Sequence, residues 1–270
     1  MKISLLLFGQ FRSYKYNLKN NLDAIYNSLL LNNEVDVYIL TDKKQTGNFS
    51  IENELEISNL LEEYGCKIIF VKYWEDLTDY HNEDKIKENK YNLECLNNRG
   101  KNKFTANLWY RRYILNKLKN EYVLSNNLKY DLNTYLRLFD TIIIKNVENK
   151  LVKNEIENCI DNNIILLSLD TIIIGNNTVF DYVFLLGEKF ELYHDEIWND
   201  KQFSNKLNNI DKVLFNGKYT YCSEIQLLAY IFYSNYDFKI IKAPHDNNMD
   251  KQYSNGFFKV RLCEKRNIFS

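Results

Sequence analysis

A predominantly apolar run from Ile3 to Phe8 lies close to the start of the chain, and a similar run extends from Val35 to Leu40. Runs of this kind are typical of strands that are buried on both faces of a parallel sheet. Between them, apolar residues recur at close to helical spacing from Asn17 to Leu31. The pattern therefore predicts a strand, a helix and a second strand in this order.

The same alternation continues with a helix over Ile51 to Tyr64 and a third strand over Cys66 to Val71. Gly65 stands between them, where a glycine commonly ends a helix. Strands that alternate with helices connect through right-handed crossovers, because a helix between two strands of one sheet packs back onto that sheet. We therefore expect an α/β fold whose central sheet is mostly parallel and flanked by helices.

The rest of the chain is less regular but still predicts alternating elements. The polar stretch 72–103 predicts a long loop, and loops of that length in a compact domain usually have a function. Apolar spacing then predicts helices at 104–122, 152–159 and 180–198, and strands at 133–138, 142–144, 164–167, 171–174 and 239–242. Ser223 and Gln226 form a capping box that opens a further helix.

Composition limits the function classes. A chain of 270 residues can bury one full core, and its 35 basic residues nearly cancel its 36 acidic ones, which disfavours nucleic-acid binding. The five cysteines contain no CxxC pair, so a reducing compartment is expected. No run reaches the roughly 18 apolar residues of a membrane span. These features predict a single-domain, soluble protein of the cytoplasm.

The first candidate site follows the first two strands. In an open parallel sheet, ligands bind beyond the carboxyl ends of the strands. Gly9 allows a close backbone approach there, and Arg12 offers a planar set of donors that suits a phosphate. Thr41 and Asp42 end the second strand, where ribose or base hydroxyls are commonly bound, although these residue types also favour turns.

The central strand carries the second candidate. Arg137 and Asp140 are three residues apart, so both side chains can reach one ligand only if the strand breaks near Leu138. We expect such a break, with Asp140 facing a metal or the donor. Arg137 then either contacts phosphate or braces Asp140. The alternative is a structural ion pair at the edge of the core.

Other candidates are more widely spread. Arg111 lies on the apolar stripe of its helix and either serves the site or pairs with a nearby carboxylate. Glu224 is a candidate general base, although the first turn of any helix favours glutamate. Asp170 and Asp181 are candidates for contacts to sugar hydroxyls, and His245 is a candidate metal ligand.

The segment Phe8-Gly9-Gln10-Phe11-Arg12 resembles the G-Q-x-R start of viral and bacterial glycosyltransferase-like proteins of GT-A type. The segment from Tyr130 to Asp140 resembles their YD…R-x-x-D signature, which aligns with a DxD metal motif. The resemblance extends loosely over the whole chain. It implies a nucleotide-binding half at 1–145, with contacts from Gly9, Gln10, Arg12, Thr41, Asp42, Arg111 and Arg137, and an acceptor or catalytic half at 146–270.

The resemblance also implies an activity. The expected reaction moves a sugar from a UDP- or GDP-sugar to a glycan or protein acceptor, assisted by Mn²⁺ or Mg²⁺ at Asp140 and His245, with Glu224 or Asp170 in catalysis. A viral relative would act in the host cytoplasm. Leu138 stands where a true DxD has its first aspartate, so a noncatalytic nucleotide- or sugar-binding relative stays an alternative. A nucleotidyltransferase is a third, which the lack of a basic glycine-rich loop disfavours.

Overall fold

The computed structural model describes residues 1–11, 14–43, 51–81, 105–138, 153–168, 172–190 and 238–240, together with residues 227, 230, 231, 234 and 236. The first half contains β1 (Lys2–Phe8), α1 (Tyr14–Ile25), the π-helix η1 (Tyr26–Leu30), β2 (Glu34–Thr41), α2 (Ile51–Glu63), β3 (Cys66–Tyr73), the 3-10 turns η2 (Trp74–Asp76) and η3 (Thr78–Tyr80), α5 (Thr105–Ser125) and β4 (Leu132–Arg137). The second half contains α6 (Lys153–Asn162), β5 (Ile165–Ser168), β6 (Ile172–Gly175), α7 (Asn177–Glu188) and β7 (Phe238–Ile240).

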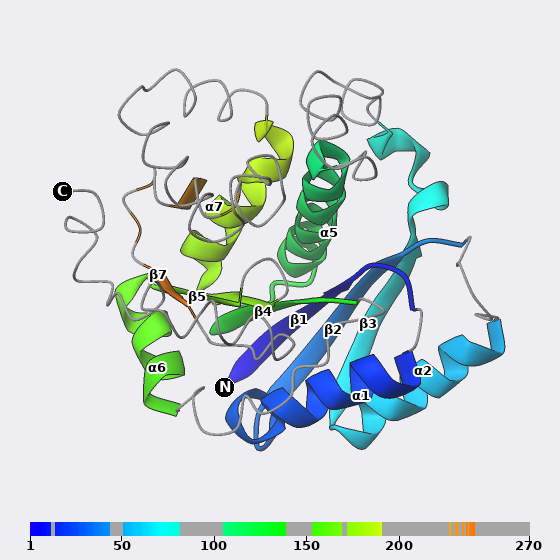
Figure 1. Cartoon of the computed structure of the whole chain (residues 1–270), viewed down its shortest axis with the longest axis horizontal. Coiled ribbons are helices and arrows are strands. Elements are labelled where there is room, and N and C mark those ends of the chain that lie inside the picture. The colour runs from blue at the N-terminus through cyan, green and yellow to red at the C-terminus, as the bar shows by residue number, and fades with distance from the viewer. Residues whose placement is uncertain are drawn as a thin grey trace, which may run out of the picture.

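The described strands form one sheet of seven in the order β3-β2-β1-β4-β6-β5-β7. Strands β1 to β4 are mutually parallel, and β5 pairs with β7 in parallel. Strand β6 runs antiparallel to both of its neighbours. The sheet is therefore mixed, and the predicted α/β class with a mostly parallel sheet flanked by helices is confirmed (Figure 1).

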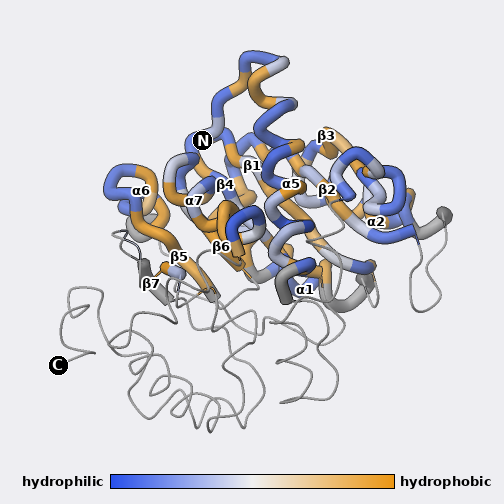
Figure 2. Tube along the Cα trace, turned by 90° about the horizontal axis from the view of Figure 1, so that it is seen from above, coloured by the Kyte–Doolittle hydropathy of each residue, from blue (hydrophilic) through white to orange (hydrophobic). Residues whose placement is uncertain are grey.

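Helices cover both faces of the sheet. Side chains alternate between the faces along a strand, so Leu6 and Phe8 of β1 pack on one side while Leu5 and Leu7 pack on the other. Helices α5 and α7 cover the first side, and α1, α2 and α6 cover the second (Figure 1). Figure 2 shows hydrophobic strands enclosed by helices with hydrophilic outer positions. Burial of these alternating apolar sets holds the layers together.

One predicted element needs correction. The helix predicted over 180–198 begins earlier, because Asn176 caps α7 by accepting a hydrogen bond from the Val179 backbone amide at 3.2 Å. The strands predicted at 164–167 and 171–174 are present as β5 and β6, which pair with each other in antiparallel orientation. The predicted strand at 142–144 lies outside the described residues.

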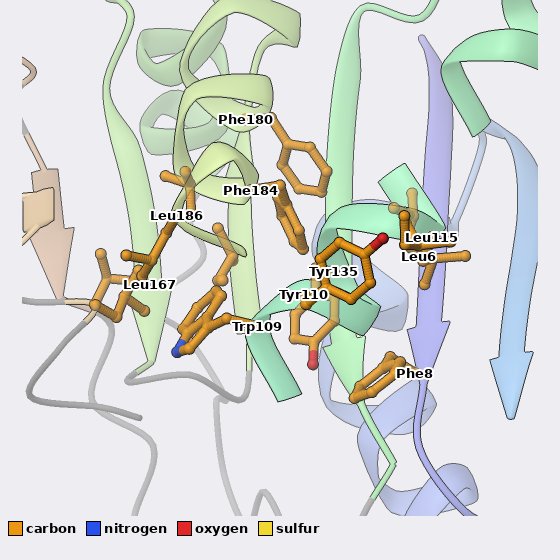
Figure 3. Packing of buried hydrophobic residues seen from close by; sticks show 14 of the residues in the cluster. Leu6, Phe8, Trp109, Tyr110, Leu115, Tyr135, Leu167, Phe180, Phe184 and Leu186 are labelled. Atoms are coloured by element: carbon orange, nitrogen blue, oxygen red, sulfur yellow. The ribbon is translucent and has the colours of Figure 1, made fainter. Parts of the chain in front are cut away.

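Aromatic side chains fill the core under α5 and α7. Figure 3 shows Phe180 and Phe184 of α7 beside Tyr135 of β4, with Phe8 at the end of β1. The Tyr135 and Phe184 rings meet edge to face with centroids 5.4 Å apart. Helix α7 approaches α5 closely at Gly187, beside the backbone of Trp109. The position of α5 is therefore fixed by the sheet below it and α7 beside it.

A buried amine lies between α5, α7 and β4. Lys119 is 1% exposed and donates to Asn133 Oδ1 at 3.1 Å, while Asp181 Oδ1 lies 3.9 Å from its ammonium nitrogen. Asn116 and Asn120 donate to the same Asp181 oxygen at 2.7 and 3.0 Å. Burial lowers the pKa of Lys119 from its ordinary value of 10.5 to about 8, although the Asp181 carboxylate offsets part of this effect.

This low pKa predicts a measurable pH dependence of stability. Between pH 8 and 10.5 the unfolded chain still binds the Lys119 proton and the folded chain has released it, so stability rises with pH. Relative to the variant Lys119→Met, we expect the wild-type free energy of unfolding to rise by about 2 kcal/mol from pH 7 to pH 10. Urea denaturation of both proteins across this range measures the difference.

The comparison with the variant is needed because other groups titrate in the same range. Burial raises the pKa of the Cys66 thiol to about 12, and the stability that this provides is lost as pH rises above 9. Both proteins contain Cys66, so its contribution cancels in the difference. A difference that stays constant from pH 7 to pH 10 would contradict the buried-amine interpretation.

Candidate functional site

The candidate site lies at the carboxyl ends of the parallel strands. Strands β2 and β3 lie on one side of β1, and β4 lies on the other. The chain therefore runs from β1 to β2 and β3 on one side and then crosses to β4 on the other side of β1. Such a reversal of strand order is a switch point, where open α/β sheets bind ligands. Gly9 and Gln10 follow β1, Asp42 follows β2, and Leu138 follows β4. The fold brings these sequence-distant residues to one edge of the sheet.

Gly9 joins the ends of three strands. Its backbone amide donates to the Leu40 carbonyl at 3.2 Å, and the Leu138 amide donates to the Phe8 carbonyl at 2.7 Å. Gly9 has a φ of +122°, and a Cβ atom there would lie 2.6 Å from the Leu138 carbonyl oxygen. A glycine is therefore required both by the backbone conformation and by the close approach of the chain after β4.

Asp42 links Gln10 to Arg111. Its Oδ1 atom forms an ion pair with Arg111 Nη2, and its Oδ2 atom accepts a hydrogen bond from Gln10 Nε2 at 3.1 Å. The side chains of Asp42 and Arg111 are 17% and 18% exposed, so solvent reaches both. Thr41, by contrast, is 1% exposed. Three predicted site residues are thus in direct contact, while Thr41 belongs to the packed end of β2.

Aromatic rings hold the guanidinium of Arg111 in place. Its Cζ atom lies 4.9 Å from the ring centroid of Trp74 and 5.6 Å from that of Phe8. Both distances suit cation–π attraction. Trp74 follows β3 directly, so the third strand also contributes to this edge. The backbone amide of Lys43 donates to Glu75 at 2.9 Å, which ties the end of β2 to the turn that carries Trp74.

Two further arginines lie beside Phe8. Arg137 pairs with Phe8 across β4 and β1, and it shares with Tyr135 the sheet face that α5 and α7 cover. Arg112 is fully buried, with its Cζ atom 5.8 Å from the Phe8 ring, 5.3 Å from Tyr135 and 4.4 Å from Trp109. Guanidinium groups are the donors that proteins use for phosphate and carboxylate oxygens. An anionic or strongly polar ligand suits this edge.

Several predicted site residues cannot be placed. Arg12, Asp140, Asp170, Glu224 and His245 lie outside the described residues. Strand β4 does end at Arg137, as the predicted break near Leu138 requires. Within the described part of the chain, no group of three or more His, Cys, Asp or Glu side chains is arranged to hold a metal ion. Asp181 lies on α7 against α5, bonded to Asn116 and Asn120.

Sequence reasoning did not single out Trp74 or Arg112. Trp74 follows the third strand directly, so the rule that ligands bind beyond the carboxyl ends of strands was a sufficient signal. Arg112 gave no comparable signal, because a charged residue in a helix is expected to face solvent. Of the three rings around it, Trp109 lies on the same helix, while Phe8 and Tyr135 come from strands distant in sequence.

Comparison with protein-family models, with curated proteins and with solved structures found no match. Across the ranges of the chain that the structure describes, the helices are all too short or too polar to cross a bilayer.

Proposed function

We propose that this protein transfers a sugar from a nucleotide-diphosphate donor to a glycan or protein acceptor. The observation that supports this best is the contact of Gln10, Asp42 and Arg111 beside Gly9 at the switch point of the sheet. These residues come from the ends of β1 and β2 and from the start of α5. A mostly parallel sheet with helices on both faces also agrees with the GT-A-type fold that the sequence resemblance implies.

The chemistry of the edge suits such a donor. Gly9 allows a ligand to approach the backbone, and Arg111 and Arg137 offer guanidinium donors to phosphate oxygens. The Asp42 carboxylate accepts hydrogen bonds, as ribose hydroxyls require. On this proposal, catalysis by these residues is positioning of the donor and stabilisation of the charge that develops on the leaving diphosphate.

The remaining parts of the proposed reaction fall on residues outside the described ranges. Asp140 and His245 are the proposed ligands of Mn²⁺ or Mg²⁺, which would neutralise charge on the leaving diphosphate. Glu224, with Asp170 as an alternative, is the proposed base that accepts the proton of the acceptor hydroxyl. Arg12 is proposed to contact the diphosphate next to Gly9.

Calorimetric titration with UDP, GDP and CMP, each with and without Mn²⁺, tests the proposal. We expect one nucleoside diphosphate to bind, and we expect Arg111→Gln to weaken its binding by about tenfold or more, because a charge-assisted hydrogen bond is lost. Lys117→Gln is the matched control, since it removes one positive charge from an exposed position on the same helix. Failure of all three nucleotides to bind the wild-type protein would refute the proposal.

Donor turnover separates transfer from simple binding. A transferase should hydrolyse or transfer its sugar-nucleotide donor, and Asp140→Ala should lower that rate. Nucleotide binding without turnover, and without any effect of Asp140→Ala, would instead identify a noncatalytic binding protein of the same fold.

A further inference from the structure

Arg111 is already neutralised by a carboxylate of the same chain. Asp42 and Arg111 are both partly exposed, at 17% and 18%, and both lie at the edge where ligands are expected. Arg112, on the next position of the same helix, is fully buried. The Asp42–Arg111 pair is therefore a part of this arginine cluster that an incoming ligand can reach.

The geometry limits how a ligand can meet Arg111. The guanidinium lies over the rings of Trp74 and Phe8, at 4.9 and 5.6 Å from their centroids, so these rings cover part of its surface. Its Nε atom is buried and has no hydrogen-bond partner among the described residues. A ligand must approach through the terminal nitrogens, and Asp42 already accepts from one of them, Nη2. A phosphate group that binds Arg111 would occupy space next to a fixed carboxylate.

Asp42 is itself held from two sides. Gln10 Nε2 donates to its second oxygen at 3.1 Å, so turning the carboxylate away from an arriving ligand would break this hydrogen bond as well as the ion pair. The Asp42 carboxylate and a phosphate group bound to Arg111 would be two negative charges at short range. Such charges repel each other more strongly in a partly buried site than in water. The cost of binding therefore rises with the negative charge of the ligand.

We propose that Asp42 is a specificity-determining residue that competes with the ligand's phosphate groups for Arg111 and disfavours ligands in proportion to their negative charge. This inference rests on the proposed function in one respect, namely that the site takes a phosphorylated ligand. A nucleotide-sugar carries less charge than the nucleoside diphosphate released from it, because the sugar esterifies the terminal phosphate. Asp42 then favours the donor over the product and speeds product release.

The test uses inorganic pyrophosphate as the probe, with inorganic phosphate as the less charged reference. We expect Asp42→Asn to tighten pyrophosphate binding by about tenfold and phosphate binding by less, because removing the carboxylate removes the repulsion. In the double variant Asp42→Asn/Arg111→Gln the gain should disappear, since it depends on Arg111. Isothermal titration at low ionic strength measures all three proteins.

Two controls test whether net charge or a loss of folding causes the change in pyrophosphate binding. Asp79→Asn removes one negative charge from an exposed position on η3, so it reports the general effect of net charge. Asp42→Ser, with thermal unfolding of every variant, shows whether the effect depends on the asparagine side chain or on a loss of folding. A gain for Asp79→Asn equal to that for Asp42→Asn would overturn the inference.

Other outcomes of the titrations also decide whether Asp42 competes with the ligand for Arg111. Unchanged, weaker or undetectable pyrophosphate binding by Asp42→Asn overturns the competition and leaves Asp42 as a ligand-contacting or structural residue. A gain that persists in the double variant overturns it as well. Tighter pyrophosphate binding in a protein that binds no nucleotide would support this inference while the proposed function fails. If the wild-type protein binds a nucleotide but Asp42→Asn binds pyrophosphate no more tightly, the proposed function is supported and this inference fails.

Discussion

Replacing Gly187 with alanine is expected to lower the free energy of unfolding by about 3 kcal/mol. A Cβ atom at this position would overlap the carbonyl oxygen of Trp109 and lie 2.7 Å from Tyr113 Cβ. Both contacts belong to α5, and the clashing Trp109 atoms are backbone, so no side chain can turn aside to relieve them. Helices α5 and α7 would have to move apart, which opens the aromatic core between them.

The expected loss of stability is opposite in sign to the change that helix propensity predicts. Gly187 is the next-to-last residue of α7, and helix propensity alone predicts that alanine would stabilise the protein by up to about 1 kcal/mol. Urea denaturation of Gly187→Ala therefore separates close packing from propensity by direction as well as size. Glu188→Ala is the matched control on the next residue, because it removes only the exposed hydrogen bond from Tyr113. We expect that control to cost less than about 1 kcal/mol.

Helix α5, which packs against Gly187, also carries Arg111 to the candidate site. If α7 fixes the position of α5, the variant should also weaken nucleotide binding in proportion to the displacement of that helix. An alanine variant as stable as the wild type would show that the two helices can separate without cost.

The first half of the fold could be predicted because β1 and β2 are buried on both faces along almost their whole length. Apolar runs such as Ile3 to Phe8 admit few other interpretations, and Gly65 marks the end of the helix before β3. The direction of β6 was not predicted, since Ile-Ile-Ile-Gly is equally compatible with either direction. The short connection between β5 and β6 did indicate an antiparallel pair, because parallel strands need a crossover of about a dozen residues or more.

The candidate site could be predicted only where it follows strand ends. Gly9, Gln10 and Asp42 were identified because each follows a strand whose carboxyl end lies at the ligand edge. Arg111 stayed ambiguous, since its place on the apolar stripe of the helix is as compatible with a pair to a nearby carboxylate as with a role in the site. Only the three-dimensional structure separates the partly exposed Arg111, which is paired with Asp42, from the fully buried Arg112.

Gly9→Ala should impair both the fold and the proposed ligand binding. The φ of +122° is unfavourable for any residue with a Cβ, and that Cβ would lie 2.6 Å from the Leu138 carbonyl oxygen. We expect a loss of about 2 to 3 kcal/mol in the free energy of unfolding, which combines backbone strain with the clash.

Ligand binding should suffer more than stability. To accept the alanine, the chain after β1 must move away from Leu138, and this displaces Gln10, which donates to Asp42. We expect nucleotide binding to weaken by more than about tenfold under conditions where the variant is fully folded. Titration calorimetry and urea denaturation on the same preparation measure the two effects separately.

Gly65→Ala is the control that separates strain from position. Gly65 also has a positive φ, of +74°, but a Cβ there would meet nothing within 4 Å. The residue lies between α2 and the amino end of β3, whereas the candidate site lies at the carboxyl ends of the strands. Its replacement should cost about 1 kcal/mol of stability and leave nucleotide binding unchanged. If Gly9→Ala bound the nucleotide as tightly as Gly65→Ala does, the junction between β1 and β4 would not be the binding site.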